Sequence, residues 1–154
     1  HVVIYFEAVD LPELWDFFTA LPTTVVVDHM GRPDVSKPID GPEFELFVKF
    51  MRQHPNVWSK VSCPERLSVT GPKGLSGEQH AYKDVIPFAR LIVETFPDRV
   101  LWGTDWPHPN LKDHMPDDGL LVDFIPHIAT TPERQRKLLV DNPMRLYWPE
   151  ERGA

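Results

Sequence analysis

Four short segments of the chain are almost continuously apolar, which is typical of strands covered on both faces of a parallel sheet. Each is rich in β-branched or aromatic side chains, and they span residues 2–6, 24–29, 57–62 and 99–104. The sequence therefore predicts four buried parallel strands.

Between and after these segments, apolar residues recur at the three- and four-residue spacing of an amphipathic helix. Five segments show this spacing: residues 11–20, 42–53, 82–95, 120–129 and 132–140. Thr131 directly precedes the last of them and is predicted to be its N-cap. The resulting order, β-α-β-α-β-α-β-α-α, implies a parallel sheet connected by crossover helices.

Two α/β architectures have this order, namely an open doubly wound sheet and part of a (β/α)8 barrel. No predicted strand is followed by Gly-x-Gly-x-x-Gly, which disfavours a dinucleotide-binding doubly wound sheet. The chain has 154 residues, 42% of them hydrophobic and 25% charged, which is the composition of one globular core. A complete barrel needs about 250 residues, so we expect residues 1–154 to form a single partial domain.

The net charge of −7 argues against nucleic-acid binding and provides no polybasic patch for a membrane surface. The longest apolar runs, such as the three valines at 25–27, are too short to span a bilayer. Cys63 is the single cysteine, which excludes a disulfide within the chain, and no signal-peptide pattern is present. These features predict a cytoplasmic protein.

Polar residues concentrate directly after the predicted strands. They are Asp28, His29 and Arg32 after the second strand, Cys63, Glu65 and Arg66 after the third, and Asp105 and His108 after the fourth. Because sites in parallel α/β folds lie at the carboxyl ends of the strands, we expect these groups to converge on one face. The glycine-containing segment 67–80 is long enough to act as a lid over such a site.

Three segments resemble the amidohydrolase superfamily, in particular the amidohydrolase-related family 2. Residues 100–108, VLWGTDWPH, resemble the end of its last barrel strand, where an Asp stands beside the hydrolytic water. Residues 27–32 resemble its fifth strand and the following loop, and residues 141–147 resemble its closing helix. The resemblance implies the C-terminal half of a (β/α)8 barrel. The His-x-His pair that this family carries on its first strand is absent from the sequence.

Within this family, the pattern of site residues is similar to that of lactone hydrolases. The resemblance implies that Asp105 activates water, that His29 stabilises the oxyanion, and that Arg32, Arg66 and Tyr5 bind the substrate. Planar guanidinium groups bind carboxylates with two parallel hydrogen bonds, which suits a dicarboxylate. The implied reaction opens 2-pyrone-4,6-dicarboxylate to 4-carboxy-2-hydroxymuconate, or 4-oxalomesaconate, in bacterial breakdown of lignin-derived aromatic compounds. These lactonases are metal-independent, so no cofactor is implied.

Other interpretations of the same residues remain open. An Asp after a Gly-x pair can cap a turn, a strand-end His can hold a loop, and loop arginines are usually solvated. In metal-using relatives the residues that match His29 and Asp105 bind the metal, so a zinc-dependent hydrolase or decarboxylase is an alternative. A non-catalytic α/β fragment is a second alternative.

Four strands cannot close an eight-stranded barrel. We therefore expect a homo-oligomer that completes the barrel, or an N-terminal half that precedes these residues. Without either, the sheet would expose both of its edges and its apolar interior face.

Overall fold

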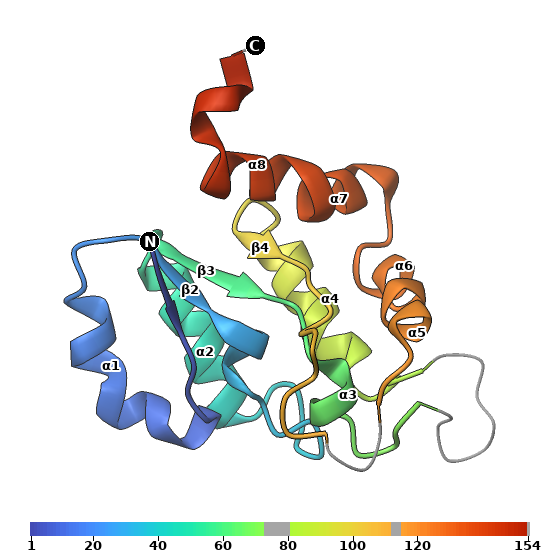
Figure 1. Cartoon of the computed structure of the whole chain (residues 1–154). Coiled ribbons are helices and arrows are strands. Elements are labelled where there is room, and N and C mark those ends of the chain that lie inside the picture. The colour runs from blue at the N-terminus through green and yellow to red at the C-terminus, as the bar shows by residue number, and fades with distance from the viewer. Residues whose placement is uncertain (73–80, 112–114, 154) are drawn as a thin grey trace.

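In a computed structural model, which describes residues 1–72, 81–111 and 115–153, the four strands form one parallel sheet (Figure 1). The strands are β1 (Val2–Ile4), β2 (Val25–Val27), β3 (Val57–Lys60) and β4 (Val100–Leu101). They lie side by side in chain order, which is the order of a (β/α)8 barrel and not of a doubly wound sheet with its reversal point. The predicted class is therefore confirmed: the chain has the α/β fold of half a (β/α)8 barrel.

The register of the sheet brings the ends of the strands to one edge. Ile4 pairs with Val27, Val27 pairs with Ser59, and Lys60 pairs with Leu101. Because all four strands run in the same direction, the segments that follow these residues leave the sheet at the same edge. This edge carries the polar residues that the sequence placed after the strands.

The strands are shorter than predicted, and a residue of positive φ follows β2, β3 and β4. The second strand ends at Val27, since Asp28–Gly31 forms the 3-10 turn η2 with His29 and Met30 at positive φ. The third ends before Cys63 (φ 65°), and the fourth ends well before Asp105 (φ 66°). L-amino acids rarely adopt positive φ, and no strand continues through it.

One face of the sheet is covered by α1 (Leu11–Thr19), α2 (Pro42–Gln53) and α4 (Ile86–Thr95), as Figure 1 shows. The main core lies between this face and the helices. It contains Val25, Val27, Val57 and Val100 of the strands together with the helical phenylalanines Phe18, Phe44, Phe47, Phe50 and Phe88. The helix α4 begins four residues later than predicted, because Tyr82 has a φ of 57° and residues 81–85 form turns.

The C-terminal helices differ from the prediction in how they are divided. The predicted helix 120–129 is two helices, α5 (Asp118–Asp123) and α6 (Ile125–Ile128), and Pro126 lies at the break, where it has no N–H to donate. Thr131 caps α7 (Pro132–Arg136) by accepting a hydrogen bond from the N–H of Arg134, as predicted. The chain then continues through η3 (Lys137–Asp141) into α8 (Asn142–Tyr147), in the segment that resembled a closing helix.

Four further elements are short and have no counterpart in the sequence prediction: η1 (Ala8–Asp10), η2, α3 (Pro64–Leu67) and η4 (Pro149–Gly153). Each spans three to five residues, too few for an apolar repeat to show in the sequence. Among the described residues, no helix has the length and apolar character needed to cross a membrane.

The opposite face of the sheet is less exposed than we expected. Val26, Trp58 and Leu101 point to this face and are buried, because Leu146 of α8 packs against them. The guanidinium of Arg145 also lies 4.8 Å from the centre of a Trp58 ring. The expectation of an exposed interior face is therefore wrong for this part of the sheet. The β1 edge is open as expected, with Val2 and Val3 exposed.

Candidate active site

The side chains of His29, Arg66 and Asp105 meet at the carboxyl edge of the sheet. His29 follows β2, Arg66 lies in α3 after β3, and Asp105 follows β4. Arg66 Nη2 donates a hydrogen bond to Asp105 Oδ2 at 2.8 Å and lies 3.1 Å from His29 Nε2. His29 Nε2 lies 3.5 Å from Asp105 Oδ1. Three predicted site residues from three separate loops are thus in mutual contact.

A left-handed backbone turn places each part of this cluster. His29, Cys63 and Asp105 have φ values of 53°, 65° and 66°. Cys63 is the residue directly before α3, so its turn sets the direction of the helix that carries Arg66. The sharp turns direct the side chains across the edge of the sheet, which a continued strand would not do.

The surroundings of His29 favour its neutral form. Burial, together with the positive charges of Arg66 and Arg32, lowers the pKa of the His29 imidazole against the attraction of the Asp105 and Asp28 carboxylates. Arg66 can only donate hydrogen bonds, so His29 Nε2, 3.1 Å from Arg66 Nη2, is the accepting nitrogen. The proton is then on Nδ1, which lies 2.8 Å from the hydroxyl oxygen of the buried Ser62.

Ligand-type atoms of His29, Cys63 and Asp105 lie within 4.8 Å of one another, which raises the question of a metal. However, the Arg66 guanidinium contacts all three, since its Nε also donates to Cys63 Sγ at 2.8 Å. A divalent cation among them would face this positive charge. Burial raises the pKa of the Cys63 thiol to about 12, whereas metal binding needs the thiolate. In the described part of the chain, this cluster therefore fits a metal ion poorly.

The other two predicted site residues, Tyr5 and Arg32, are joined by Glu7. Tyr5 donates from its hydroxyl to Glu7 Oε1 at 2.6 Å, and Arg32 Nε donates to Glu7 Oε2 at 3.3 Å. The hydrogen bond from Tyr5 lowers the pKa of the Glu7 carboxyl. The Tyr5 ring meets the His29 imidazole edge to face, with the ring centres 6.0 Å apart. This second cluster therefore adjoins the first.

Arg32 retains unused hydrogen-bonding capacity. Its Nη1 atom is buried and finds no hydrogen-bond acceptor among the described residues. A cavity of about 270 Å³ lies here, and Glu7, Arg32 and Arg66 contribute to its lining. A buried guanidinium N–H without an acceptor is costly, so the position is suited to an anionic ligand.

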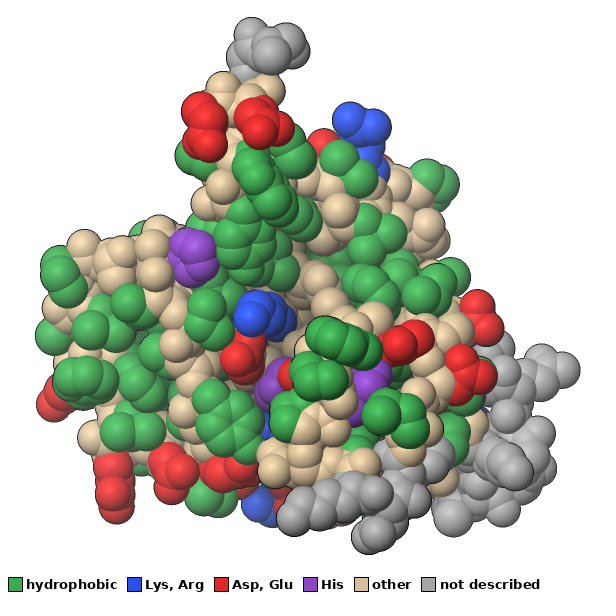
Figure 2. All heavy atoms as spheres, viewed as in Figure 1, with side chains coloured by type: hydrophobic (Ala, Val, Ile, Leu, Met, Phe, Trp, Pro, Cys, Tyr) green, Lys and Arg blue, Asp and Glu red, His purple; other side chains and the backbone are tan. Residues whose placement is uncertain are grey.

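A second cavity, of about 470 Å³, is lined by Asp105 and His29. Lys60 and Asp28 form an ion pair of 2.7 Å in its wall, and Trp102, Trp106 and Trp148 supply aromatic surface. Figure 2 shows basic, acidic and histidine side chains gathered near the centre of the viewed face, below a band of hydrophobic side chains. The cluster is thus accessible from two cavities.

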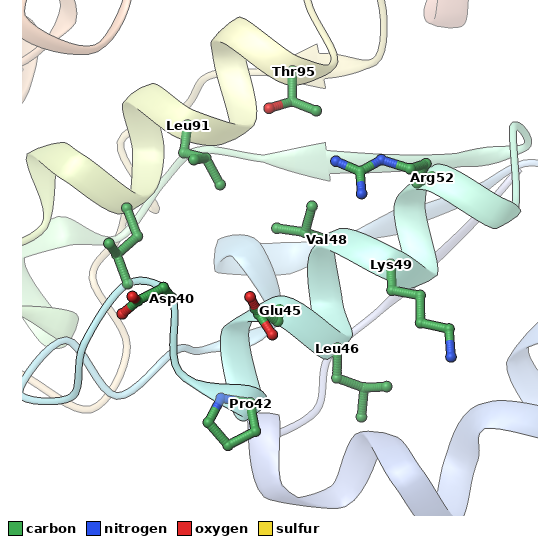
Figure 3. Close-up of a pocket in the computed structure, with 10 residues that line it drawn as sticks. Asp40, Pro42, Glu45, Leu46, Val48, Lys49, Arg52, Leu91 and Thr95 are labelled. Carbon is green, nitrogen blue, oxygen red and sulfur yellow. The ribbon is translucent and has the colours of Figure 1, made fainter.

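A larger groove of about 620 Å³ lies elsewhere, between α2 and α4 (Figure 3). Val48 and Leu91 lie against it, while Glu45, Lys49 and Arg52 add charges of both signs. It lies on the helical layer, away from the carboxyl ends of the strands, and contains none of the predicted site residues. We therefore place the candidate site at Asp105.

The sequence did not identify several partners of these residues. Glu7 and Ser62 carry no motif, and their contacts with Arg32 and His29 join segments far apart in the chain. Cys63, which the sequence placed among the polar residues after the third strand, is buried and accepts a hydrogen bond from Arg66. The expected lid, residues 67–80, lies partly outside the described residues, since 73–80 are not described. The described beginning of this segment is held by Asp84, whose carboxylate accepts hydrogen bonds from the backbone N–H groups of Val69 and Thr70.

Comparison with known proteins places this geometry in a family. An amidohydrolase family profile matches residues 1–148. The chain is 86% identical over 151 residues to a 2-pyrone-4,6-dicarboxylate hydrolase of Comamonas testosteroni, covering 98% of this chain and 50% of that protein. It is 37% identical over 155 residues to a 4-sulfomuconolactone hydrolase of Hydrogenophaga intermedia, covering 99% and 48%.

The fold is found in solved structures as well. The apo crystal structure of an Agrobacterium tumefaciens protein matches with a TM-score of 0.75 and 28% identity, covering 95% of this chain and 49% of that one. The chain spans about half the length of the curated relatives it matches. The profile match covers nearly the whole chain, including the strand ends that carry His29, Arg66 and Asp105. The chain therefore belongs to the amidohydrolase family.

Proposed function

We propose that this chain supplies the catalytic carboxylate of a metal-independent lactone hydrolase that acts on a dicarboxylated lactone. The observation that carries the proposal is the meeting of His29, Arg66 and Asp105 at the ends of three adjoining strands. The Comamonas relative, a hydrolase of 2-pyrone-4,6-dicarboxylate, suggests the substrate. We further propose that residues 1–154 are the C-terminal half of one barrel domain in a cytoplasmic enzyme.

Asp105 acts as the general base in this proposal. Its side chain is 16% exposed, so water reaches it while most of its surroundings are protein. The carboxylate accepts a proton from water, and the water oxygen forms a bond to the lactone carbonyl carbon. The tetrahedral intermediate then collapses, the ring C–O bond breaks, and the leaving oxygen takes the proton from Asp105. With 2-pyrone-4,6-dicarboxylate, this opens the ring to 4-carboxy-2-hydroxymuconate, or 4-oxalomesaconate, a reaction of aromatic-compound breakdown.

His29 and Arg66 are placed to stabilise the negative charge that develops on the carbonyl oxygen. In the structure, Arg66 donates toward His29 Nε2, which leaves this nitrogen without a proton. The oxyanion therefore has its donor in the Arg66 guanidinium itself. His29 becomes a donor from Nε2 only when Arg66 turns away, toward a substrate carboxylate, and the ring proton shifts from Nδ1.

Arg32 and Tyr5 bind a substrate carboxylate in this proposal. Arg32 and Arg66 both line the same cavity, so two guanidinium groups border one space. A carboxylate bound there would supply the acceptor that Arg32 Nη1 lacks among the described residues. In the absence of substrate, Glu7 binds both Arg32 and Tyr5. Its carboxylate is half exposed, so a substrate carboxylate can replace it as the partner of these two side chains.

The alternative of a zinc-dependent hydrolase rests on the three ligand-type atoms of His29, Cys63 and Asp105. It requires Arg66 to leave all three and Cys63 to lose its proton. We therefore favour water activation by Asp105 alone.

The decisive experiment replaces Asp105 by Asn in the full-length gene product that carries this chain. Loss of a general base lowers kcat by roughly 10²- to 10⁴-fold, while KM and the thermal midpoint stay close to wild type. Asp98→Asn is a matched control, because its carboxylate is 58% exposed and pairs with Lys137 away from the site. Near-normal hydrolysis of the lactone by Asp105→Asn would refute the assignment.

A further inference from the structure

A second buried cluster lies behind the Asp105 turn and takes no part in the proposed chemistry. His108 Nδ1 lies 3.4 Å from Glu65 Oε1, and His108 Nε2 lies 3.1 Å from Asp118 Oδ1. The side chains of His108 and Glu65 are each only 1% exposed, whereas that of Asp118 is 52% exposed. Sequence analysis placed His108 among the polar residues at the strand ends but assigned it no role, and it did not predict its burial between two carboxylates.

The position of this cluster relates it to the site. Glu65 directly precedes Arg66 in α3, and His108 follows Asp105 by three residues. The contact between Glu65 and His108 therefore joins the same two segments as the ion pair between Arg66 and Asp105. In the proposed function, Arg66 and Asp105 also contact the substrate, whereas Glu65 and His108 do not.

The Asp105 loop has a backbone conformation that contacts elsewhere in the fold help to hold. Asp105, His108 and Asn110 all have positive φ, which costs free energy for any side chain other than glycine, although Asn, Asp and His tolerate it better than most. The loop is closed by the hydrogen bond from the His108 N–H to the Asp105 carbonyl, at 2.7 Å. A ring anchored at both nitrogens fixes the end of that turn.

The burial of the Glu65 carboxyl carries an energetic penalty. Glu65 Oε2 is buried without a hydrogen-bond partner among the described residues. Burial raises the pKa of the Glu65 carboxyl, and an apolar residue of similar size would avoid this penalty.

We propose that His108 and Glu65 are positioning residues, which hold the Asp105 loop against α3 so that the Asp105 carboxylate and the Arg66 guanidinium keep their separation. This role rests on the proposed hydrolase function, because it acts through Asp105. The positioning role differs from a general contribution to stability, because its loss lowers kcat, the rate at which bound substrate reacts.

The test measures kcat, KM and thermal midpoint for wild type, His108→Ala, His108→Asn and Glu65→Gln in the full-length gene product. Misplacing a catalytic group by about 1 Å lowers the rate by about 10²-fold, so His108→Ala should lower kcat up to this amount with little change in KM. His108→Asn keeps a donor near the Nδ1 position and should recover part of the loss. Asp98→Asn is the control, because its exposed carboxylate pairs with Lys137 away from both clusters, and it should leave kcat unchanged.

Introducing His108→Ala into the Asp105→Asn variant distinguishes positioning of Asp105 from a general loss of stability. If His108 acts through Asp105, the kcat of Asp105→Asn and of the double variant should agree, because the group to be positioned is already lost. Undiminished kcat in His108→Ala, or equal loss in both backgrounds, would overturn the positioning role while leaving the hydrolase function intact. Absence of lactone hydrolysis in the wild-type protein would overturn both.

Discussion

Replacing Arg32 by Met tests whether the site selects its substrate by charge. The substitution keeps a long side chain but removes the guanidinium, including the buried Nη1 that has no acceptor among the described residues. Arg32 contacts Glu7, whereas Arg66 contacts Asp105 and His29 directly. Arg32→Met should therefore affect substrate binding and leave the reacting groups in place, while Arg66→Met should change both KM and kcat.

The expected magnitude follows from the number and type of contacts. A hydrogen bond between charged groups contributes about 1.5–3 kcal/mol, which corresponds to roughly a 10- to 100-fold rise in KM for a dicarboxylated lactone. The loss of Arg32 also frees the Glu7 carboxylate, whose hydrogen bond from Arg32 Nε is 3.3 Å long, to repel the dianion. The double variant Arg32→Met/Glu7→Gln should thus have a lower KM than Arg32→Met alone.

The assay compares steady-state kinetics of the full-length gene product on the dicarboxylated lactone and on an uncharged lactone of similar size. KM for the uncharged substrate should change little in Arg32→Met. An equal rise in KM for both substrates would show that Arg32 does not bind a carboxylate. Identical KM values for the single and double variants would show that Glu7 exerts no repulsion.

Four further results are expected. Asn142 is 1% exposed and donates from Nδ2 to the carbonyls of Pro97 and Val100 at 2.9 and 2.8 Å. Asn142→Ala should therefore lower the free energy of unfolding, measured in urea titrations, by roughly 2 kcal/mol. A loss below about 0.5 kcal/mol would contradict this. Treatment with a chelator should leave activity unchanged, and loss of activity that zinc restores would favour the metal-dependent alternative. Burial lowers the pKa of His29 below 6.5, so the unfolded chain takes up this proton before the folded chain does as pH falls. The free energy of unfolding and kcat/KM should therefore both stay constant down to pH 6.5. A fall in kcat/KM above pH 6.5 that disappears in His29→Asn would refute the assignment of a neutral ring. Residues 1–154 expressed alone should show no useful lactone hydrolysis, because four strands leave the barrel open. A chain that is monomeric in sedimentation and active in kinetic assays would disprove the need for the other half of the barrel.

The sequence predicted the sheet well because buried parallel strands leave a strong signal. Runs such as the valines at 25–27 are fully buried and belong to β2. The ends of the strands were predicted less well, since nothing in the sequence marks His29 or Cys63 as left-handed. Sharp turns at non-glycine residues depend on contacts made elsewhere in the fold, which a local pattern does not contain.

The candidate site shows the same division. Asp105 was found because it lies in a contiguous motif, and His29 and Arg66 because each follows a strand that the pattern marks. Their contacts with one another were only implied by the convergence of strand ends. Glu7 was missed, because its role depends on contacts with Arg32 and Tyr5 that have no fixed spacing in the sequence.

The left-handed turns at His29, Cys63 and Asp105 also limit how this site can change in evolution. Asn, Asp and His are the side chains other than glycine that tolerate this conformation best, and β-branched residues tolerate it worst. At two of the three positions, the residues that the backbone accepts are thus also those that exchange protons or bind cations. A β-branched residue at position 29 or 105 would therefore strain the turn as well as remove the reacting group, whereas Asn would keep the turn and remove only the chemistry.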